Sequence, residues 1–139
     1  MPSSTKMAIE LDDKEFPLLR VRFSSNWTQQ DFDGYLARYL AQLQKRQPFA
    51  AVFDATQSRA PSATERRQQA EFLREHEALL RRYCTGVAFV IASPTIRGAL
   101  TAIFWIQPPF FEYVVVSSVA EGTAWARQRL ALRQQIAIR

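Results

Sequence analysis

The chain has 139 residues, of which 47% are hydrophobic and 22% are charged, and its formal net charge is +5. This balance is typical of a folded globular domain and excludes an intrinsically disordered chain. Because the apolar runs are short and Cys84 is the only cysteine, we expect no membrane span, no intrachain disulfide and no cysteine-built metal site. We expect a single cytoplasmic domain over residues 1–139, with its core at about 7–132.

The positive charge comes mostly from arginine, since 15 Arg stand beside only 3 Lys. The last nineteen residues hold four arginines against one acid, Glu121, so this end of the chain could suit an anionic partner. No motif that reads nucleic acid accompanies these arginines, and we expect no nucleic-acid binding.

Two short apolar stretches, 7–11 and 18–23, show partial alternation and are separated by a polar turn. They predict two adjacent antiparallel strands. Asn26 or Thr28 can then cap a helix whose apolar residues recur every three or four positions, and Pro48 ends it.

A continuous apolar run at 49–53 ends at Asp54 and is typical of a central strand. After a polar loop, Ser62 and Glu65 have the spacing of a capping box. This box predicts a helix that begins at Ser62 and runs to Tyr83.

Gly86 is predicted to terminate that helix, and residues 87–92 to form another apolar strand. Ser93-Pro94 predicts the start of a third helix, which runs to about Ile106. Residues 112–116 predict the last strand, and a second capping box at Ser118 starts the final helix.

The predicted order is therefore β-β-α-β-α-β-α-β-α. Helices that alternate with apolar strands indicate an α/β fold with a mostly parallel central sheet, and only the first strand is expected to run antiparallel, at an edge. The helices are expected to pack on the sheet. The strands at 49–53, 87–92 and 112–117 are expected to be parallel neighbours buried on both faces.

Few residues indicate catalysis or a cofactor. The four glycines lack the spacing of a phosphate-binding loop, and a single histidine excludes a two-histidine metal site, so we expect no cofactor and no metal. His76 is either a general base or, as we favour, a partly buried histidine bonded to a neighbour. Cys84 is expected to be a small buried side chain rather than a reactive thiol.

Asp54 ends a central strand on the carboxyl side of the sheet, where open α/β proteins bind ligands. Hydroxyl groups follow it in the loop and at the next helix start, and together they suit a switch or an anion-binding loop: Asp54, Thr56, Ser58, Ser62 and Thr64. The alternative, which we favour, is structural: Asp54 closes a turn and Ser62 caps a helix.

The segment from Ile103 to Phe111 is unusually rich in large apolar residues. Residues 103–106 sweep about 300° around a helix, so they cannot all face one sheet. We therefore expect at least one ring to form a ligand or partner surface, with four candidates: Phe104, Trp105, Phe110 and Phe111. The alternative is a sandwiched helix in which all four rings are buried.

The element order, the strand ending in Asp54, the capped helix after it and the run Glu121-Gly122-Thr123-Ala124-Trp125 resemble the STAS domain superfamily, and most of all its SpoIIAA-like branch. Members of that branch often end in a strand followed by a helix with an Ala-x-x-Trp type of pattern, and Gly122 and Trp125 stand in those places. The resemblance covers about 7–132 and implies a STAS-like fold.

STAS domains of the anti-sigma-antagonist type are similar in carrying a phosphorylatable serine in an Asp-Ser-x-Gly loop. This chain has Asp54-Ala55-Thr56-Gln57 there, without the glycine. The SpoIIAA-like branch is also similar in fold to CRAL-TRIO lipid-transfer domains, and this similarity suggests an apolar ligand.

The leading hypothesis is a non-enzymatic regulatory or protein-binding module, expected to be a homodimer, in which the 104–111 surface makes the contacts and the 54–64 loop modulates them. The second hypothesis is a carrier or sensor of a small apolar or lipid-like ligand, held between the helix predicted at 94–106 and the sheet. A weaker alternative is a small enzyme that uses Asp54 and His76.

Overall fold

A five-stranded sheet with the strand order β1-β2-β3-β4-β5 forms the centre of the structure. The computed structural model describes residues 7–138, with side chains up to residue 135. The antiparallel pair is β1 (Ile9–Asp12) with β2 (Leu18–Phe23), and the parallel strands are β2, β3 (Phe49–Asp54), β4 (Cys84–Val90) and β5 (Tyr113–Val116). The predicted α/β class, with a mostly parallel sheet and an antiparallel edge strand, is confirmed.

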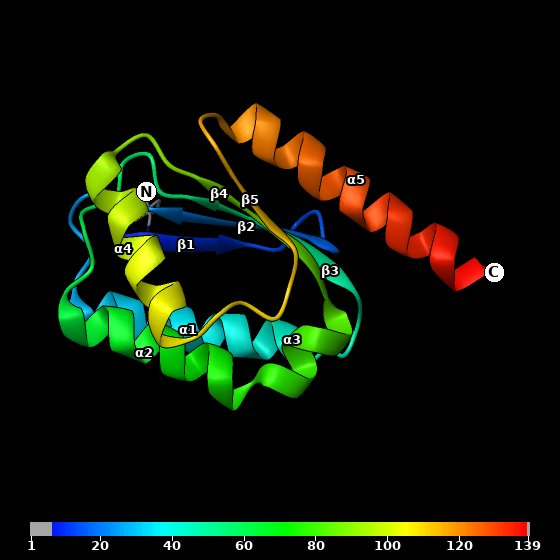
Figure 1. Cartoon of the computed structure of the whole chain (residues 1–139), viewed down its shortest axis with the longest axis horizontal. Coiled ribbons are helices and arrows are strands. Elements are labelled where there is room, and N and C mark those ends of the chain that lie inside the picture. Colours follow the sequence, from blue (N-terminus) through cyan, green and yellow to red (C-terminus); the bar gives the residue numbers. More distant parts are fainter. Residues whose placement is uncertain (1–6, 139) are drawn as a thin grey trace, which may run out of the picture.

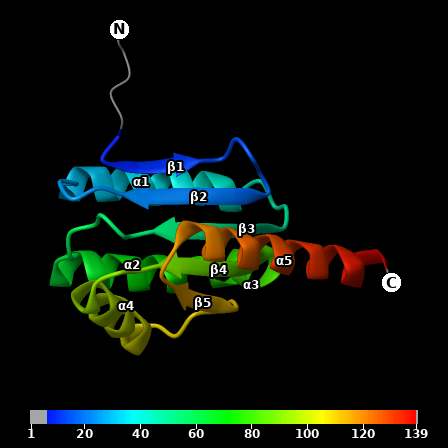
Figure 2. The same ribbon diagram turned by 90° about the horizontal axis from the view of Figure 1, so that it is seen from above.

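The helices are divided unequally between the two faces of the sheet (Figure 1). One face carries α1 (Gln29–Leu43), α2 (Ala63–Glu75), α3 (Glu77–Tyr83) and α4 (Pro94–Ile106), and the other carries α5 (Val119–Ile138). Each connection among β2 to β5 joins neighbouring strands in the same direction, so crossovers of one hand place all their helices on one face. Figure 2 shows α5 crossing over the β3–β4 half of the sheet.

Alternation along each strand supplies both faces with apolar side chains. The α1–α4 face is large and aromatic and includes Phe49 and Phe53 of β3. The α5 face is smaller and includes Ala50 and Val52 of the same strand. Strand β3 is therefore buried from both sides, as its continuous apolar run predicts.

Side-chain caps set the helix starts as predicted. The hydroxyl of Ser62 accepts from the backbone N–H of Glu65, whose carboxylate accepts from the N–H of Ser62. Ser93 caps α4, and the Ser118 hydroxyl accepts from a backbone N–H of α5. Of the two candidates for α1, Thr28 is the cap.

The prediction of one helix from Ser62 to Tyr83 is wrong. The helix breaks at His76, whose backbone angles are φ −110° and ψ 26°, and α3 begins at the next residue. The chain has to turn from α2 into β4, which starts directly after α3, and the redirected α3 buries Leu80 completely.

The prediction that Gly86 terminates a helix is also wrong, because Gly86 lies inside β4. A Cβ atom at Gly86 would be 2.8 Å from the ring of Trp125, so the missing side chain makes room for that ring. Gly122 acts in the same way, since a Cβ there would be 3.2 Å from a Val90 methyl and 3.3 Å from Ala88. The two glycines let α5 lie close to the sheet.

The expected burial of the last strand on both faces is wrong as well. Strand β5 is an edge strand that pairs with β4 alone, its three valines are half-buried and Tyr113 is 44% exposed. In the stretch that the structure describes, none of the helices is both long and apolar enough to cross a bilayer.

Candidate functional site

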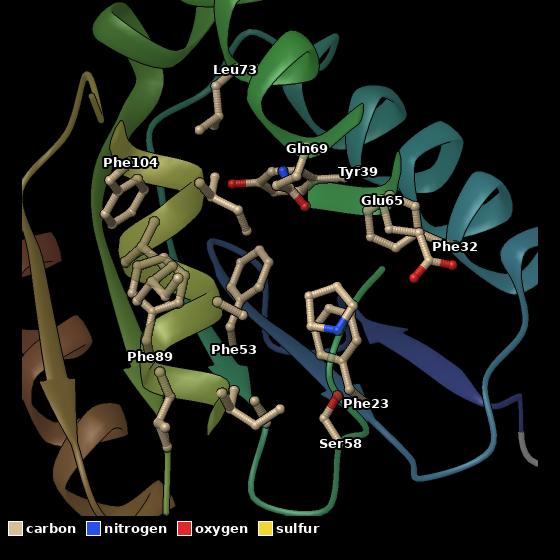
Figure 3. Close-up of a pocket in the computed structure, with 18 of the residues that line it drawn as sticks. Phe23, Phe32, Tyr39, Phe53, Ser58, Glu65, Gln69, Leu73, Phe89 and Phe104 are labelled. Atoms are coloured by element: carbon tan, nitrogen blue, oxygen red, sulfur yellow. The ribbon is translucent and has the colours of Figure 1, made fainter. Parts of the chain in front are cut away.

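An apolar cavity of about 120 Å³ lies between α2, α4 and the sheet. Figure 3 shows side chains from the strands, from α1, α2 and α4, and from the loop after β3 converging on it. Eight of its twenty lining residues are aromatic: Phe23, Trp27, Phe32, Tyr39, Phe53, Phe89, Phe104 and Phe111.

The rings pack against one another along three neighbouring strands. Phe53 is the register partner of Phe89, with ring centroids 5.6 Å apart, and its ring also lies 6.2 Å from Phe23 and 5.7 Å from Tyr39. Helix α4 packs mainly against α2 rather than against the strands beneath it. Space therefore remains between α4 and this aromatic floor.

Tyr39 brings a hydroxyl group to the cavity. Figure 3 shows its ring extending from α1 toward α4. Its hydroxyl forms no hydrogen bond within the described residues, whereas the neighbouring Tyr35 hydroxyl donates to Gln69 at 3.1 Å. Burial, together with Cys84 and Tyr35, raises the pKa of Tyr39 well above its usual value, so the group stays neutral.

A hydrogen-bond network fixes the loop that closes one side of the cavity. The two terminal nitrogens of Arg59 each donate to Glu65 at 3.1 Å, and the Arg59 Nε donates to the backbone carbonyl of Trp27 at 2.8 Å. The guanidinium carbon lies 3.4 Å from the centroid of the Trp27 ring. The Trp27 Nε1 donates in turn to the Ser58 hydroxyl at 3.1 Å.

Glu65 is almost completely buried in this network. Burial alone would raise the pKa of its carboxyl group, but the hydrogen bonds from Arg59 and from the backbone of Ser62, with the charge of Arg59, outweigh burial and lower the pKa. The acid is therefore held in its charged form beside a mostly apolar cavity.

The four rings of the 104–111 segment face three different environments. Phe104 and Phe111 line the cavity. Phe110 is half-buried, with the Arg81 guanidinium 4.7 Å from its ring centroid. Trp105 is 83% exposed, so at least one large ring lies at the surface.

The polar residues predicted after β3 do not form one site. The Asp54 carboxylate accepts from the backbone N–H and the hydroxyl of Thr56, which closes a turn on the α5 side of the sheet. Ser58 lines the cavity, Ser62 caps α2, and Thr64 is exposed. The structure thus places these five residues in four separate surroundings.

Asp54 precedes α2 at the end of β3, whereas His76 lies at the C-terminal end of that helix, whose thirteen residues extend about 20 Å. The His76 ring packs 4.6 Å from the Phe72 ring. Cys84 is buried, and burial raises the pKa of its thiol to about 12. Among the described residues, no group of three or more His, Cys, Asp and Glu side chains could hold a metal ion.

The sequence patterns place most of the cavity rings in strands or on helix faces, but they do not indicate that these rings meet in one cavity. One available signal was a phenylalanine near the end of three successive strands: Phe23, Phe53 and Phe89. No such signal indicates that Trp27 and Arg59 contact each other, since the two residues are 32 positions apart in the sequence.

Solved structures share this architecture. An uncharacterised protein with a SpoIIAA-like fold from Shewanella loihica matches with a TM-score of 0.59 and 15% sequence identity, over 90% of this chain and 99% of that chain. An anti-sigma factor antagonist from Mycobacterium paratuberculosis matches with a TM-score of 0.58 and 14% identity, over 91% of this chain and 99% of that chain. No family model matches the chain, and no curated protein does. The chain has a SpoIIAA-like fold, as the sequence resemblance predicts.

Proposed function

We propose that this protein is a non-enzymatic binding module that takes up a small apolar molecule, as a carrier or sensor, in the cavity beneath α4. The observation that carries the proposal is a volume of about 120 Å³ lined mainly by aromatic and aliphatic side chains. An engineered apolar cavity of roughly 150 Å³ in another protein stays dry and binds benzene. A ligand of one ring or a short branched chain therefore suits this space.

Apolar contact supplies the free energy of binding. Atoms that line an empty space lack contact partners on that side, and a ligand that fills the space provides them. The apolar ligand is also removed from water, which is favourable in itself. The Tyr39 hydroxyl can donate one hydrogen bond to a ligand with an acceptor, which would fix the ligand's orientation.

Ligand binding, with and without a substitution that fills the cavity, tests the proposal. Wild-type protein is expected to bind toluene or phenol in a calorimetric titration and to melt at a higher temperature in their presence. Ile103→Trp, which places a larger side chain in the lining, is expected to abolish both effects. Trp105→Ser, on the outer side of the same helix, is the matched control and should bind as wild type does. Equal binding by wild type and Ile103→Trp would overturn the proposal.

A second candidate function is protein contact through α4 and β5, with a second copy of this chain as the partner. Exposed apolar side chains favour it: Trp105 is 83%, Ile106 50% and Tyr113 44% exposed. Tryptophan is also enriched among residues that dominate binding energy at interfaces. Trp105→Ser should leave the melting temperature unchanged and weaken self-association in sedimentation experiments. Wild-type protein that stays monomeric at all concentrations would exclude this function.

A further inference from the structure

A second pocket, of about 440 Å³, lies where α3 and α5 meet the start of β4. The segment that follows α4 passes beside α3 on its way to β5 and closes one side of this pocket (Figure 1). Three arginines and one acid line it: Arg81, Arg129, Arg133 and Glu112. The lining is therefore positively charged.

Two of these arginines, Arg129 and Arg133, form no ion pair with an acid whose side chain the structure describes. Arg129 donates from Nε to the backbone carbonyl of Thr85 at 3.3 Å, and Arg133 donates from a terminal nitrogen to the carbonyl of Arg82 at 2.8 Å. Both side chains are half-buried, and neither forms an ion pair with a carboxylate of the described residues. Each guanidinium keeps further N–H donors for another acceptor.

Their spacing favours a bound anion. Arg129 and Arg133 are four residues apart and share one face of α5, where like charges repel. An anion between them offsets this repulsion and accepts charge-assisted hydrogen bonds from both.

The basic pocket and the apolar cavity have one wall in common. Phe111 lines both, and Phe110 and Leu132 add further apolar surface to the basic pocket. Phe111 thus borders both a space that suits hydrocarbon and a space that suits negative charge.

We infer that the ligand is an anionic amphiphile, whose apolar end fills the cavity and whose carboxylate lies on Arg129 and Arg133, with Phe111 between the two parts. This inference rests on the proposed function of the cavity. It adds the chemical class of the ligand and a second set of binding residues.

Two probes with the same apolar part test it: phenylbutyrate carries the carboxylate, and phenylbutanol carries a hydroxyl in its place. Wild-type protein is expected to bind phenylbutyrate roughly tenfold more tightly in calorimetric titrations, because hydrogen bonds to charged groups are the stronger ones. High salt is expected to reduce the difference.

Substitutions on α5 test which side chains cause the preference for phenylbutyrate over phenylbutanol. The double substitution Arg129→Gln with Arg133→Gln is expected to remove the preference for phenylbutyrate, and the lysine pair at the same positions to retain part of it. Arg127→Gln removes the same charge from the same helix, but Arg127 pairs with Glu15 at 2.6 Å outside the pocket, so the preference should persist. Circular dichroism and thermal melting confirm that each variant is folded.

The outcomes separate this inference from the proposed function. If wild type binds both probes equally, the anion site is overturned and the cavity proposal stands. If phenylbutyrate binds equally well to wild type and to Ile103→Trp while phenylbutanol does not bind, the cavity proposal fails. An unchanged preference in the folded double glutamine variant overturns the assignment of Arg129 and Arg133.

Discussion

Glu65 combines three roles in one carboxylate: it completes the cap of α2, pairs with Arg59 and borders the cavity. Its pKa is lower in the folded protein than in the unfolded chain, so the charged form stabilises the fold above the unfolded-state pKa. This contribution is lost as the pH falls through the folded-state pKa. Glu65→Gln is therefore expected to lower the free energy of unfolding by about 1–2 kcal/mol near neutral pH. The difference in the free energy of unfolding between wild type and Glu65→Gln should shrink as the pH falls below the usual pKa range of carboxyl groups.

Urea unfolding of wild type and Glu65→Gln over a range of pH measures this difference. Glu71→Gln is the control, because Glu71 is an exposed acid on the same helix without an ion pair among the described residues. A deficit for Glu65→Gln that is the same at acidic and neutral pH would contradict a role for the carboxylate charge.

Local patterns predicted the caps because capping depends on residues within one turn. Ser62 and Glu65, three residues apart, hold each other's backbone groups irrespective of the rest of the fold. The same locality explains why Asp54 closes a turn with Thr56. The contact of Arg59 with Trp27 joins distant positions of the chain, and no local pattern indicates it.

The docking of α5 depends on the absence of two side chains. Gly86→Ala would place a methyl 2.8 Å from the Trp125 ring and is expected to destabilise the protein by about 1–3 kcal/mol through overpacking. Gly98→Ala is the matched control: it lies in α4 with nothing within 4 Å of the new methyl, so the better helix former should stabilise by about 0.5–1 kcal/mol. Chemical denaturation of both variants gives the comparison.

Equal effects of the two substitutions would show that the packing of α5 on the sheet does not depend on Gly86.

Sequence patterns misplace this glycine because a glycine at a helix end and a glycine under an aromatic ring cannot be told apart from the sequence alone. Its φ is not positive, so its role is to permit a close approach rather than a turn. The helix break at His76 also has no sequence signal, since neither glycine nor proline marks it.

Burial across the sheet predicts a gradient of stability. Strands β3 and β4 are paired on both sides and covered on both faces, whereas β5 is an edge strand that pairs on one side only and has half-buried valines. Hydrogen exchange should therefore be slowest for the amides of β3 and β4 and markedly faster for those of β5. Comparable protection of β5 would indicate that another chain covers this edge in solution.

The strand order could be predicted because alternating helices and strands leave few arrangements, and the apolar runs identified the centre of the sheet. The cavity could not be predicted in the same way. Its volume depends on how α4 leans on α2, and its lining comes from most of the elements on that face. Only the expected location of an apolar ligand, between the helix at 94–106 and the sheet, could be stated in advance.

The three tryptophans lie in three different environments: Trp27 lines the cavity beneath Arg59, Trp105 is exposed, and Trp125 is half-buried where α5 packs on Gly86. Their intrinsic fluorescence can therefore be assigned by position. In a Trp105→Phe protein the emission would come from Trp27 and Trp125 alone, because the most exposed indole is removed. A ligand entering the cavity would change the Trp27 component and leave Trp125 as an internal reference, so occupancy could be read without any added label.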